Sequence, residues 1–338
     1  MKNCPLCNSD KIKLQLEDFV GYQSEMKLDI YLCSSCETTF PSEKINANKI
    51  YDFIYKNGDN VPGYNRYWSY SNRIKSQKKP LQFLTDSEEA YWSVANELSK
   101  QQQSNNQLKI LEIGCGLGYL TYALNKEGYN AIGLDISKEA IANAKEKFGD
   151  YYVCADLFEF VKEAKNSYDI IILTEVIEHL EDPIKFIETV KEMLADNGKA
   201  IVTTPNRSIA PFDIVWDSEA PPVHHWWFGE KSMRFIARTL DLNISFVSFS
   251  NYYRKKPKTY NAEKARRKKF RQPILNADWE LINPKLPKKN GPVKLFFKNL
   301  YGNLYFLKST YLQIKKSLKP STIICNERGP ILCAVFEK

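Results

Sequence analysis

Short apolar runs alternate with amphipathic stretches through the middle of the chain. The runs have the length of buried β-strands and lie at residues 108–113, 130–135, 151–156, 168–173 and, closing a fifth run, 202–206. Between the first three runs, the spacing of apolar residues predicts helices over 119–127 and 138–147. Strands that alternate with helices build a parallel sheet covered on both faces, so the pattern predicts a doubly wound α/β domain.

The order of elements changes beyond the fifth run. Residues 230–240 have the spacing of an amphipathic helix, and 243–250 indicate a sixth strand. Residues 330–337 predict a last strand, with 321–325 as its preceding partner. The stretch between these strands, 252–320, is too long for a hairpin, and we expect it to form an insertion.

Two CxxC pairs lie at the start of the chain, Cys4 with Cys7 and Cys33 with Cys36. Strand-like runs at 11–16 and 26–32 separate them, as in a zinc ribbon. Two such pairs supply four thiolates for a closed tetrahedral site, so we predict a structural zinc ion; the alternative is four buried free cysteines. The other four cysteines are expected to be small core residues, namely Cys115, Cys154, Cys325 and Cys333.

Residues 45–107 form a connector rich in tyrosine and tryptophan, with a predicted helix within 78–98 and a polar linker at 100–107. Large aromatic side chains are needed where a helix packs on a sheet, and we expect most of them to serve that purpose. The aromatic residues in 64–68 are the candidates for a lid over a bound ligand.

Composition limits the classes of protein to consider. The 338 residues can hold one large domain with smaller attachments, and 43% of them are hydrophobic, enough for a core. No apolar run reaches the eighteen or so residues of a membrane span, and the first ten residues lack the apolar core of a secretory signal. With eight cysteines, we expect a cytoplasmic protein without structural disulfides.

The net charge of +8 is unevenly distributed. Residues 252–320 hold nineteen lysines and arginines against three acidic residues, a net +16, so the rest of the chain carries a net −8. We expect this insertion to face an anionic partner. It could cap the site and attract an acceptor such as a nucleotide-sugar or a lipid-linked diphosphate, rest on an anionic membrane surface, or bind an RNA backbone. The alternative is a solvated surface with its aromatic residues in the core.

The first apolar run ends in a glycine-rich turn, with Glu112 followed by Gly114, Gly116 and Gly118. A dinucleotide-binding turn would have its third glycine one position later, where Tyr119 stands. The pattern E-x-G-x-G-x-G resembles motif I of the class I S-adenosylmethionine (SAM) methyltransferases. The resemblance implies that Glu112 and the three glycines bind SAM, on a seven-stranded sheet whose strand seven is antiparallel.

Acidic residues end the next two runs. Asp135 lies about twenty residues past the turn, where a carboxylate can accept both ribose hydroxyls, and Ile136 would pack against the adenine. In the class I methyltransferases an acid at the position of Asp156 binds the adenine amino group, followed by a wall residue, here Leu157. The alternative for Asp156 is a helix N-cap. Thr174, at the end of the fourth run, completes the predicted cofactor set.

The sequence after the fourth run, EVIEHLEDP, carries the candidate chemistry. On a helical turn, Glu175, Glu178 and His179 would share one face and could bind Mg²⁺ or Mn²⁺. The motif resembles that of the ubiquinone-biosynthesis O-methyltransferases and of the small-RNA 3′-terminal 2′-O-methyltransferases. In those families the two glutamates and the histidine bind a divalent cation and a downstream histidine completes the site, which here implies His224, with His225 beside it.

A reaction centre without metal is the alternative. Glu175 would then contact the methionine part of SAM, and His179, His224 or His225 would remove the proton of the acceptor. In both versions SAM supplies a methyl group held in line with the attacking oxygen.

We therefore predict five regions: a zinc ribbon (1–44), the aromatic connector (45–107), a Rossmann-like methyltransferase core (108–251), the basic insertion (252–320) and the last strands of the core (321–338). The predicted activity is SAM-dependent O-methylation of a small hydroxylated or sugar-containing metabolite. One alternative is an RNA 2′-O-methyltransferase. Another is a C-methyltransferase of a deoxysugar, since a zinc-binding N-terminus before such a core also resembles the deoxysugar C-methyltransferases. An interaction module with an inactive SAM pocket is the non-enzymatic alternative.

Overall fold

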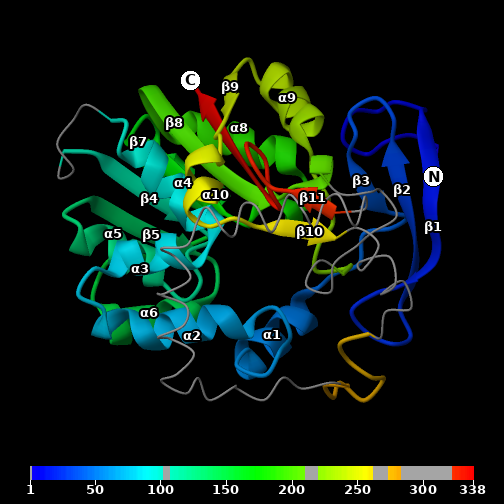
Figure 1. Ribbon diagram of the computed structural model, residues 1–338, viewed down its shortest axis with the longest axis horizontal. Helices are drawn as coiled ribbons and strands as arrows, with labels where there is room; N and C mark the ends of the chain where they lie inside the picture. Colours follow the sequence, from blue (N-terminus) through cyan, green and yellow to red (C-terminus); the bar gives the residue numbers. More distant parts are fainter. Residues whose placement is uncertain (1, 102–106, 210–219, 262–272, 283–321) are drawn as a thin grey trace.

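The computed structural model describes residues 2–101, 107–209, 220–261, 273–282 and 322–338, and the structural statements below concern these residues. They form a central sheet with helices on both faces, a small sheet at the N-terminus beside it, and a pair of helices running below it in Figure 1. No helix in these ranges combines the length and the apolar character needed to cross a membrane.

The central sheet has seven strands in the order β6-β5-β4-β7-β8-β12-β9. The strands span β4 Lys109–Ile113, β5 Asn130–Asp135, β6 Tyr152–Cys154, β7 Tyr168–Thr174, β8 Leu194–Pro205, β9 Asn243–Phe246 and β12 Ile331–Glu337. The first five in this order are parallel, and β12 runs antiparallel to both β8 and β9. The predicted α/β fold with an antiparallel last strand is confirmed.

Helices cover both faces of this sheet because its strands are apolar on both sides. Alternate residues of β7, such as Ile171 and Ile172, belong to two separate core clusters. One cluster receives α7 Leu157–Ala164, α8 Pro183–Met193 and α9 Glu230–Thr239, and the other receives α3 Pro80–Ser87, α4 Glu89–Leu98, α5 Tyr119–Lys126 and α6 Lys138–Phe148. The single helix expected within 78–98 is thus two helices, separated at Glu88, which has extended backbone.

Below the sheet lie α1 Asn48–Asn57 and α2 Asn65–Arg73, followed by the short 3₁₀ helix η1 Ile74–Ser76 (Figure 1). Ile50 and Ile54, one turn apart on α1, are buried in a third cluster. That cluster also contains Val223 from the segment before α9 and Leu275. The connector is therefore packed against the part of the chain that carries His224 and His225.

The N-terminal sheet is antiparallel and consists of β1 Ile12–Val20, β2 Lys27–Cys33 and β3 Thr39–Pro41. It brings the two CxxC pairs together, because β1 follows the first pair and β2 ends in the second. The fully buried β3 lies on the side of the sheet that faces the rest of the molecule. We use the word ribbon for residues 2–44.

Two predictions for the C-terminal region are wrong. The strand expected at 321–325 does not pair with the last strand: β11 Thr322–Ile324 pairs instead with β10 Thr259–Asn261 in a separate two-stranded sheet. Both edges of β12 are already taken by β8 and β9, so β12 has no edge left for a further strand. The sixth strand ends at Phe246, before α10 Ser250–Lys255, and most of the predicted insertion 252–320 lies outside the described residues.

Candidate active site

The turn after β4 requires glycine because its backbone has positive φ values and because a Cβ at Gly114 would collide with a neighbouring side chain. Gly114, Gly116 and Gly118 have φ values of 70°, 46° and 74°, in the left-handed region that other residues rarely adopt. A Cβ on Gly114 would lie 2.6 Å from Val176, while one on Gly116 would have only the Tyr55 hydroxyl within 4 Å, at 3.8 Å. The backbone at Gly116 is therefore open to close approach by a ligand.

Asp135 lies beside this turn at the end of β5. One of its carboxylate oxygens accepts a hydrogen bond from the Gly116 amide (2.8 Å) and the other from the Ser137 amide (2.9 Å). Burial raises the pKa of this carboxyl, and the two amides oppose the increase. Both oxygens are held in place and each keeps a further lone pair, which suits acceptance from a pair of vicinal hydroxyls. The neighbouring Ile136 is 71% exposed, so its side chain is available to cover a bound ring.

Other members of the predicted cofactor set have partners within the fold. Glu112 is buried and accepts a hydrogen bond from the Thr121 hydroxyl, which ties β4 to α5; burial raises the pKa of Glu112 to about 7. Leu157 is buried in the core, and Thr174 is half-buried at the end of β7. Asp156 caps α7 by accepting from the Phe158 amide (2.8 Å), the alternative role expected for it.

Glu178, His179 and His224 form a compact group in which the candidate ligand atoms all lie within 4.8 Å of one another. Glu178 and His179 lie on the 3₁₀ helix η2 Ile177–His179 directly after β7, and the His179 and His224 rings meet edge to face at 4.6 Å. Val176, which touches Gly114, immediately precedes η2, so this group adjoins the glycine turn. Two imidazoles and one carboxylate make a donor set that suits a borderline divalent ion such as Mn²⁺.

The orientation of His179 is determined by the main chain opposite. Its Nδ1 lies 2.7 Å from the Val223 carbonyl oxygen, which can only accept, so Nδ1 carries the proton. The Tyr51 hydroxyl donates to the same carbonyl at 3.1 Å and lies 3.0 Å from Nδ1. Burial lowers the pKa of His179, so the ring is neutral at pH 7. The lone pair of Nε2, 4.0 Å from the Glu178 carboxylate, is left to bind a cation or to accept a proton.

Glu175 is not part of this group, and its predicted convergence with Glu178 and His179 on a helical turn is wrong. The residue has φ of 56° and precedes η2, so the helical spacing does not apply to it. Its carboxylate instead accepts a hydrogen bond from the Tyr67 hydroxyl (2.5 Å) and lies 3.6 Å from the Arg66 guanidinium.

His225 also lies outside the three-residue group, although it is buried next to it. Its Nδ1 has no hydrogen-bond partner among the described residues, and burial, assisted by the charge of Lys44, lowers the pKa of its imidazole to about 4. Of the two histidines predicted from the sequence, the structure brings only His224 to the other candidate ligands.

Residues of α1 and α2 cover this region. Tyr51 and Tyr55 lie one turn apart on α1, with Tyr51 at His179 and Tyr55 at Gly116, so one helix face spans both halves of the site. Tyr67 of α2 reaches Glu175 from within the predicted lid, residues 64–68. The site residues predicted from the sequence did not include Tyr51, Tyr55 or Arg66. The i, i+4 spacing of the two tyrosines could have indicated that they share one helix face.

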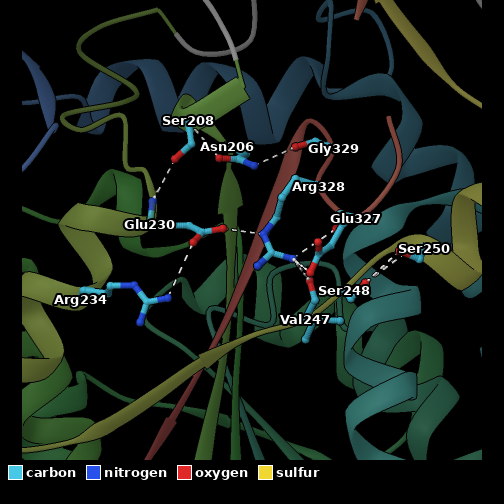
Figure 2. A network of polar contacts seen from close by, with 10 residues as sticks. All are labelled: Asn206, Ser208, Glu230, Arg234, Val247, Ser248, Ser250, Glu327, Arg328 and Gly329. Carbon is cyan, nitrogen blue, oxygen red and sulfur yellow. Dashed lines mark hydrogen bonds and ion pairs between the residues drawn. The ribbon is translucent and has the colours of Figure 1, made fainter. Parts of the chain in front are cut away.

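The segment after β8 is attached to the last loop of the chain by the polar network shown in Figure 2. Asn206 donates to the Gly329 carbonyl (3.0 Å) and accepts from the Ser208 amide (3.0 Å). Arg328 is paired with Glu230, at the start of α9, with a distance of 2.5 Å between Nε and Oε1. This network anchors both ends of the stretch between β8 and α9, in which His224 lies.

The four N-terminal cysteines fit a tetrahedral metal ion. Their sulfur atoms form one group within 4.8 Å, with separations of 3.7 Å for Cys4–Cys36 and 3.6 Å for Cys7–Cys33. A zinc ion with Zn–S bonds of about 2.3 Å requires sulfur atoms about 3.8 Å apart, close to these values. The hydrogen bond between Cys4 and Cys36 lowers the pKa of the Cys36 thiol and raises that of the Cys4 thiol. Elsewhere, Cys154 is exposed at the edge strand β6, contrary to the prediction of a core position.

Comparison with known proteins identifies the central region. Residues 83–245 match the family model described as a methyltransferase domain. The ubiquinone biosynthesis O-methyltransferase of Aliivibrio fischeri is 30% identical over 109 residues, which cover 31% of this chain and 47% of that protein. The mitochondrial ubiquinone biosynthesis O-methyltransferase of Homo sapiens is 34% identical over 110 residues, 30% of each chain. The chain thus spans less than half the length of either relative.

A SAM-dependent methyltransferase from Archaeoglobus fulgidus superposes with a TM-score of 0.46 and 13% identity, covering 80% of this chain and 99% of that one.

Proposed function

We propose that the protein transfers a methyl group from SAM to a hydroxyl oxygen, because residues 83–245 match the model of a methyltransferase domain and lie largely in the seven-stranded α/β sheet and its helices. The acceptor that we propose is a small hydroxylated or sugar-containing metabolite. One observation carries the proposal: Asp135 at the end of β5 and the turn after β7 that carries Glu178 and His179 flank the glycine turn after β4, and His224 lies with Glu178 and His179. Ligands of such sheets bind at that edge.

The cofactor half of the site would hold SAM through its nucleoside. The open backbone at Gly116 admits the ligand, and Asp135 would accept from the ribose hydroxyls. Ile136 would cover the adenine, and the second oxygen of Asp156 would accept from its amino group. Bound SAM supplies an electrophilic methyl group on a positively charged sulfur atom.

The methionine half would lie toward Glu175. Tyr67 and Arg66 hold its carboxylate from the side of α2, which fits contact with the amino group of SAM rather than with a metal ion. Tyr51 and Tyr55 would exclude water from the path between the two halves, because both are half-buried and lie on the face of α1 that meets His179 and Gly116.

In the version without metal, the neutral His179 would take the proton of the attacking hydroxyl at Nε2, since Val223 occupies Nδ1. In the version with metal, the same nitrogen would instead hold a divalent cation together with Glu178 and His224, for which we propose Mn²⁺ or Mg²⁺. Such an ion supplies Lewis acidity that lowers the pKa of a nearby hydroxyl. Alignment of the oxygen with the methyl group accounts for much of the rate in this proposal.

One experiment tests the proposal directly. The protein is incubated with methyl-labelled SAM and separate extracts of small metabolites, lipid-linked glycans and RNA, with and without a chelator that leaves the cysteine-bound zinc in place. We expect label in a base-stable linkage in the small-metabolite or glycan extract. Label found only in RNA would show that the acceptor is RNA and not a small metabolite. If calorimetry detects no binding of SAM, the proposed methyltransferase activity is refuted. Full turnover with chelator would assign proton removal to His179 without metal.

A further inference from the structure

The segment that carries His224 and His225 is bound to the ribbon as if it were another strand of its sheet. The Thr39 amide donates to the Trp227 carbonyl (3.1 Å), and the Trp227 amide donates to the Thr39 carbonyl (2.9 Å). This is an antiparallel bridge between β3 and the residues following the histidines. Thr39 and Trp227 are both buried, with exposures of 0% and 2%, so water does not compete for these bonds.

Further contacts join the same two parts of the chain. Phe40 packs against Trp226 with ring centroids 6.4 Å apart, and the Tyr22 amide donates to the Pro221 carbonyl (2.8 Å). The carbonyl of Cys36, a predicted zinc ligand, accepts from the buried hydroxyl of Ser232 in the first turn of α9 (3.1 Å). The ribbon therefore contacts the histidine segment on both sides of His224.

The opposite side of this segment is bound to the reaction centre. The amides of His225 and Trp226 both donate to the Glu178 carbonyl, at 2.9 and 3.2 Å. The Trp226 indole donates to the Leu180 carbonyl at 2.7 Å. Residues 221–228 thus lie between the ribbon and the turn that carries Glu178 and His179.

The position of β3 depends in turn on the second cysteine pair. The Cys33 amide donates to the Thr38 carbonyl (3.0 Å), and the Cys36 thiol lies 3.2 Å from the Thr38 hydroxyl. Thr39 follows directly, so a metal ion that orients Cys33 and Cys36 also orients the strand to which Trp227 is bound. A short chain of buried contacts runs from the metal ligands to Glu178.

We propose that the ribbon positions the reaction centre: its bound zinc fixes β3, and Thr39 and Phe40 set the place of His224 opposite His179. This inference rests on the proposed function for the role of His224, but the coupling itself does not require turnover. A ribbon that only tethered a partner would need none of the buried contacts between β3 and residues 221–228.

Zinc extraction from the full-length protein is the first test, with hydrogen exchange followed at individual amides. We expect the amides of residues 225–227 to exchange at least about tenfold faster without zinc, because their bonds to Thr39 and Glu178 open more often. Amides of β4 and the affinity for SAM, measured by calorimetry, should change by less than about twofold. Unchanged protection at 225–227 after zinc loss, or a native protein that takes up no zinc, would overturn the proposal.

The substitution Thr39→Pro tests the coupling with all four cysteines present. The N–H and the C=O of Thr39 are both hydrogen-bonded to Trp227. Proline at this position has no N–H, so it removes the hydrogen bond that Thr39 donates to Trp227 and leaves the hydrogen bonds between β3 and β2 in place. We expect a zinc content equal to that of the wild type, unchanged SAM affinity, faster exchange at 225–227 and a kcat lower by about tenfold, since small misplacements are costly in aligned reactions.

Ser35→Ala provides the matched control. Ser35 lies between Cys33 and Cys36, and its hydroxyl forms an exposed hydrogen bond with the hydroxyl of Ser9. This variant should match the wild type in exchange, zinc content and kcat. A Thr39→Pro protein that retains both protection and kcat would refute the positioning role. If the wild type neither binds SAM nor methylates any acceptor, the proposed function fails instead, and the exchange measurements still decide the coupling.

Discussion

At the scale of single residues, the chemistry available at the site depends on the hydrogen bonds that each polar side chain already makes within the fold. Asp135 is held by the Gly116 and Ser137 amides, His179 by the Val223 carbonyl, and Glu175 by Tyr67. These partners leave specific lone pairs available, and the chemistry proposed for each residue follows from what is left.

The substitution Asp135→Asn should weaken SAM binding by at least about tenfold. The side-chain NH₂ of asparagine would face the main-chain N–H of Gly116 or of Ser137, so that one hydrogen bond is lost. The remaining oxygen is neutral and accepts more weakly from the ribose hydroxyls. Calorimetric titration with SAM measures the effect. Asp156→Asn is the informative companion, because asparagine also caps helices, so α7 should keep its stability. If Asp156→Asn leaves SAM affinity unchanged, Asp156 is a helix cap only.

His225 makes stability depend on pH in a predictable direction. Its folded pKa of about 4 lies below the ordinary value of 6.5, so the unfolded chain binds the proton more readily. The contribution is therefore complete above pH 6.5 and is lost as the pH falls from 6.5 toward 4, by up to about 3 kcal/mol. In His225→Gln, urea unfolding between pH 7 and 4 should show a shallower loss of stability. Identical slopes for the two proteins would contradict this assignment.

At the scale of elements, the polar network of Figure 2 joins the end of β8, the start of α9 and the loop before β12. Arg328 precedes β12, Glu230 begins α9, and Asn206 follows β8. The pair between Arg328 and Glu230 is partly exposed, with 28% and 29% of the side chains accessible, so solvent screens part of its energy.

The substitution Arg328→Ala should reduce the free energy of unfolding by about 1 kcal/mol, which is the usual range for a partly exposed charged pair with added hydrogen bonds. Chemical denaturation measures it, and the double variant with Glu230→Gln gives the coupling between the two. Lys162→Ala, whose pair with Glu159 is largely exposed on α7, is a suitable control and should have an effect near zero. Equal losses for the two variants would mean that the network adds nothing beyond a surface ion pair.

Helix α1 is the element that covers both halves of the site. Tyr55→Ala should increase the rate of SAM dissociation several-fold, because removal of the ring opens the crevice above Gly116. Stopped-flow fluorescence measures this rate. Tyr31→Ala, on the ribbon and packed against Phe40, removes a ring of the same type away from the glycine turn and should leave the rate unchanged. A dissociation rate unaffected by Tyr55→Ala would exclude a covering role for α1.

At the scale of the whole molecule, the net positive charge of the chain is concentrated in residues 252–320. The net +16 of residues 252–320 lies mostly outside the described residues, so its role is a proposal from the sequence. If it attracts an anionic acceptor, raising the salt from about 50 to about 300 mM should increase the KM of that acceptor several-fold and leave the KM of SAM unchanged. Steady-state kinetics measure both constants. A KM of the acceptor that does not depend on salt would remove the electrostatic proposal.

The sequence predicted well wherever a signal was local. The alternation of apolar runs and helical spacing predicted the sheet, the glycine pattern predicted the turn after β4, and the CxxC spacing predicted a cysteine cluster. Prediction failed where a distant contact determined the outcome. The strand at 322–324 pairs with β10 because β12 has no free edge, and Glu175 leaves the metal-ligand group because its positive φ turns it toward Tyr67.

The sequence by itself determined the class of fold and the candidate ligands, because periodicity, glycine and paired cysteines act through near neighbours in the chain. Only the tertiary structure decided how these parts combine. It brought His224 to His179 across 44 intervening residues, separated Glu175 and His225 from that group, and placed Thr39 of the ribbon against Trp227. These contacts depend on packing between elements far apart in the chain, and no local pattern of residues encodes such packing.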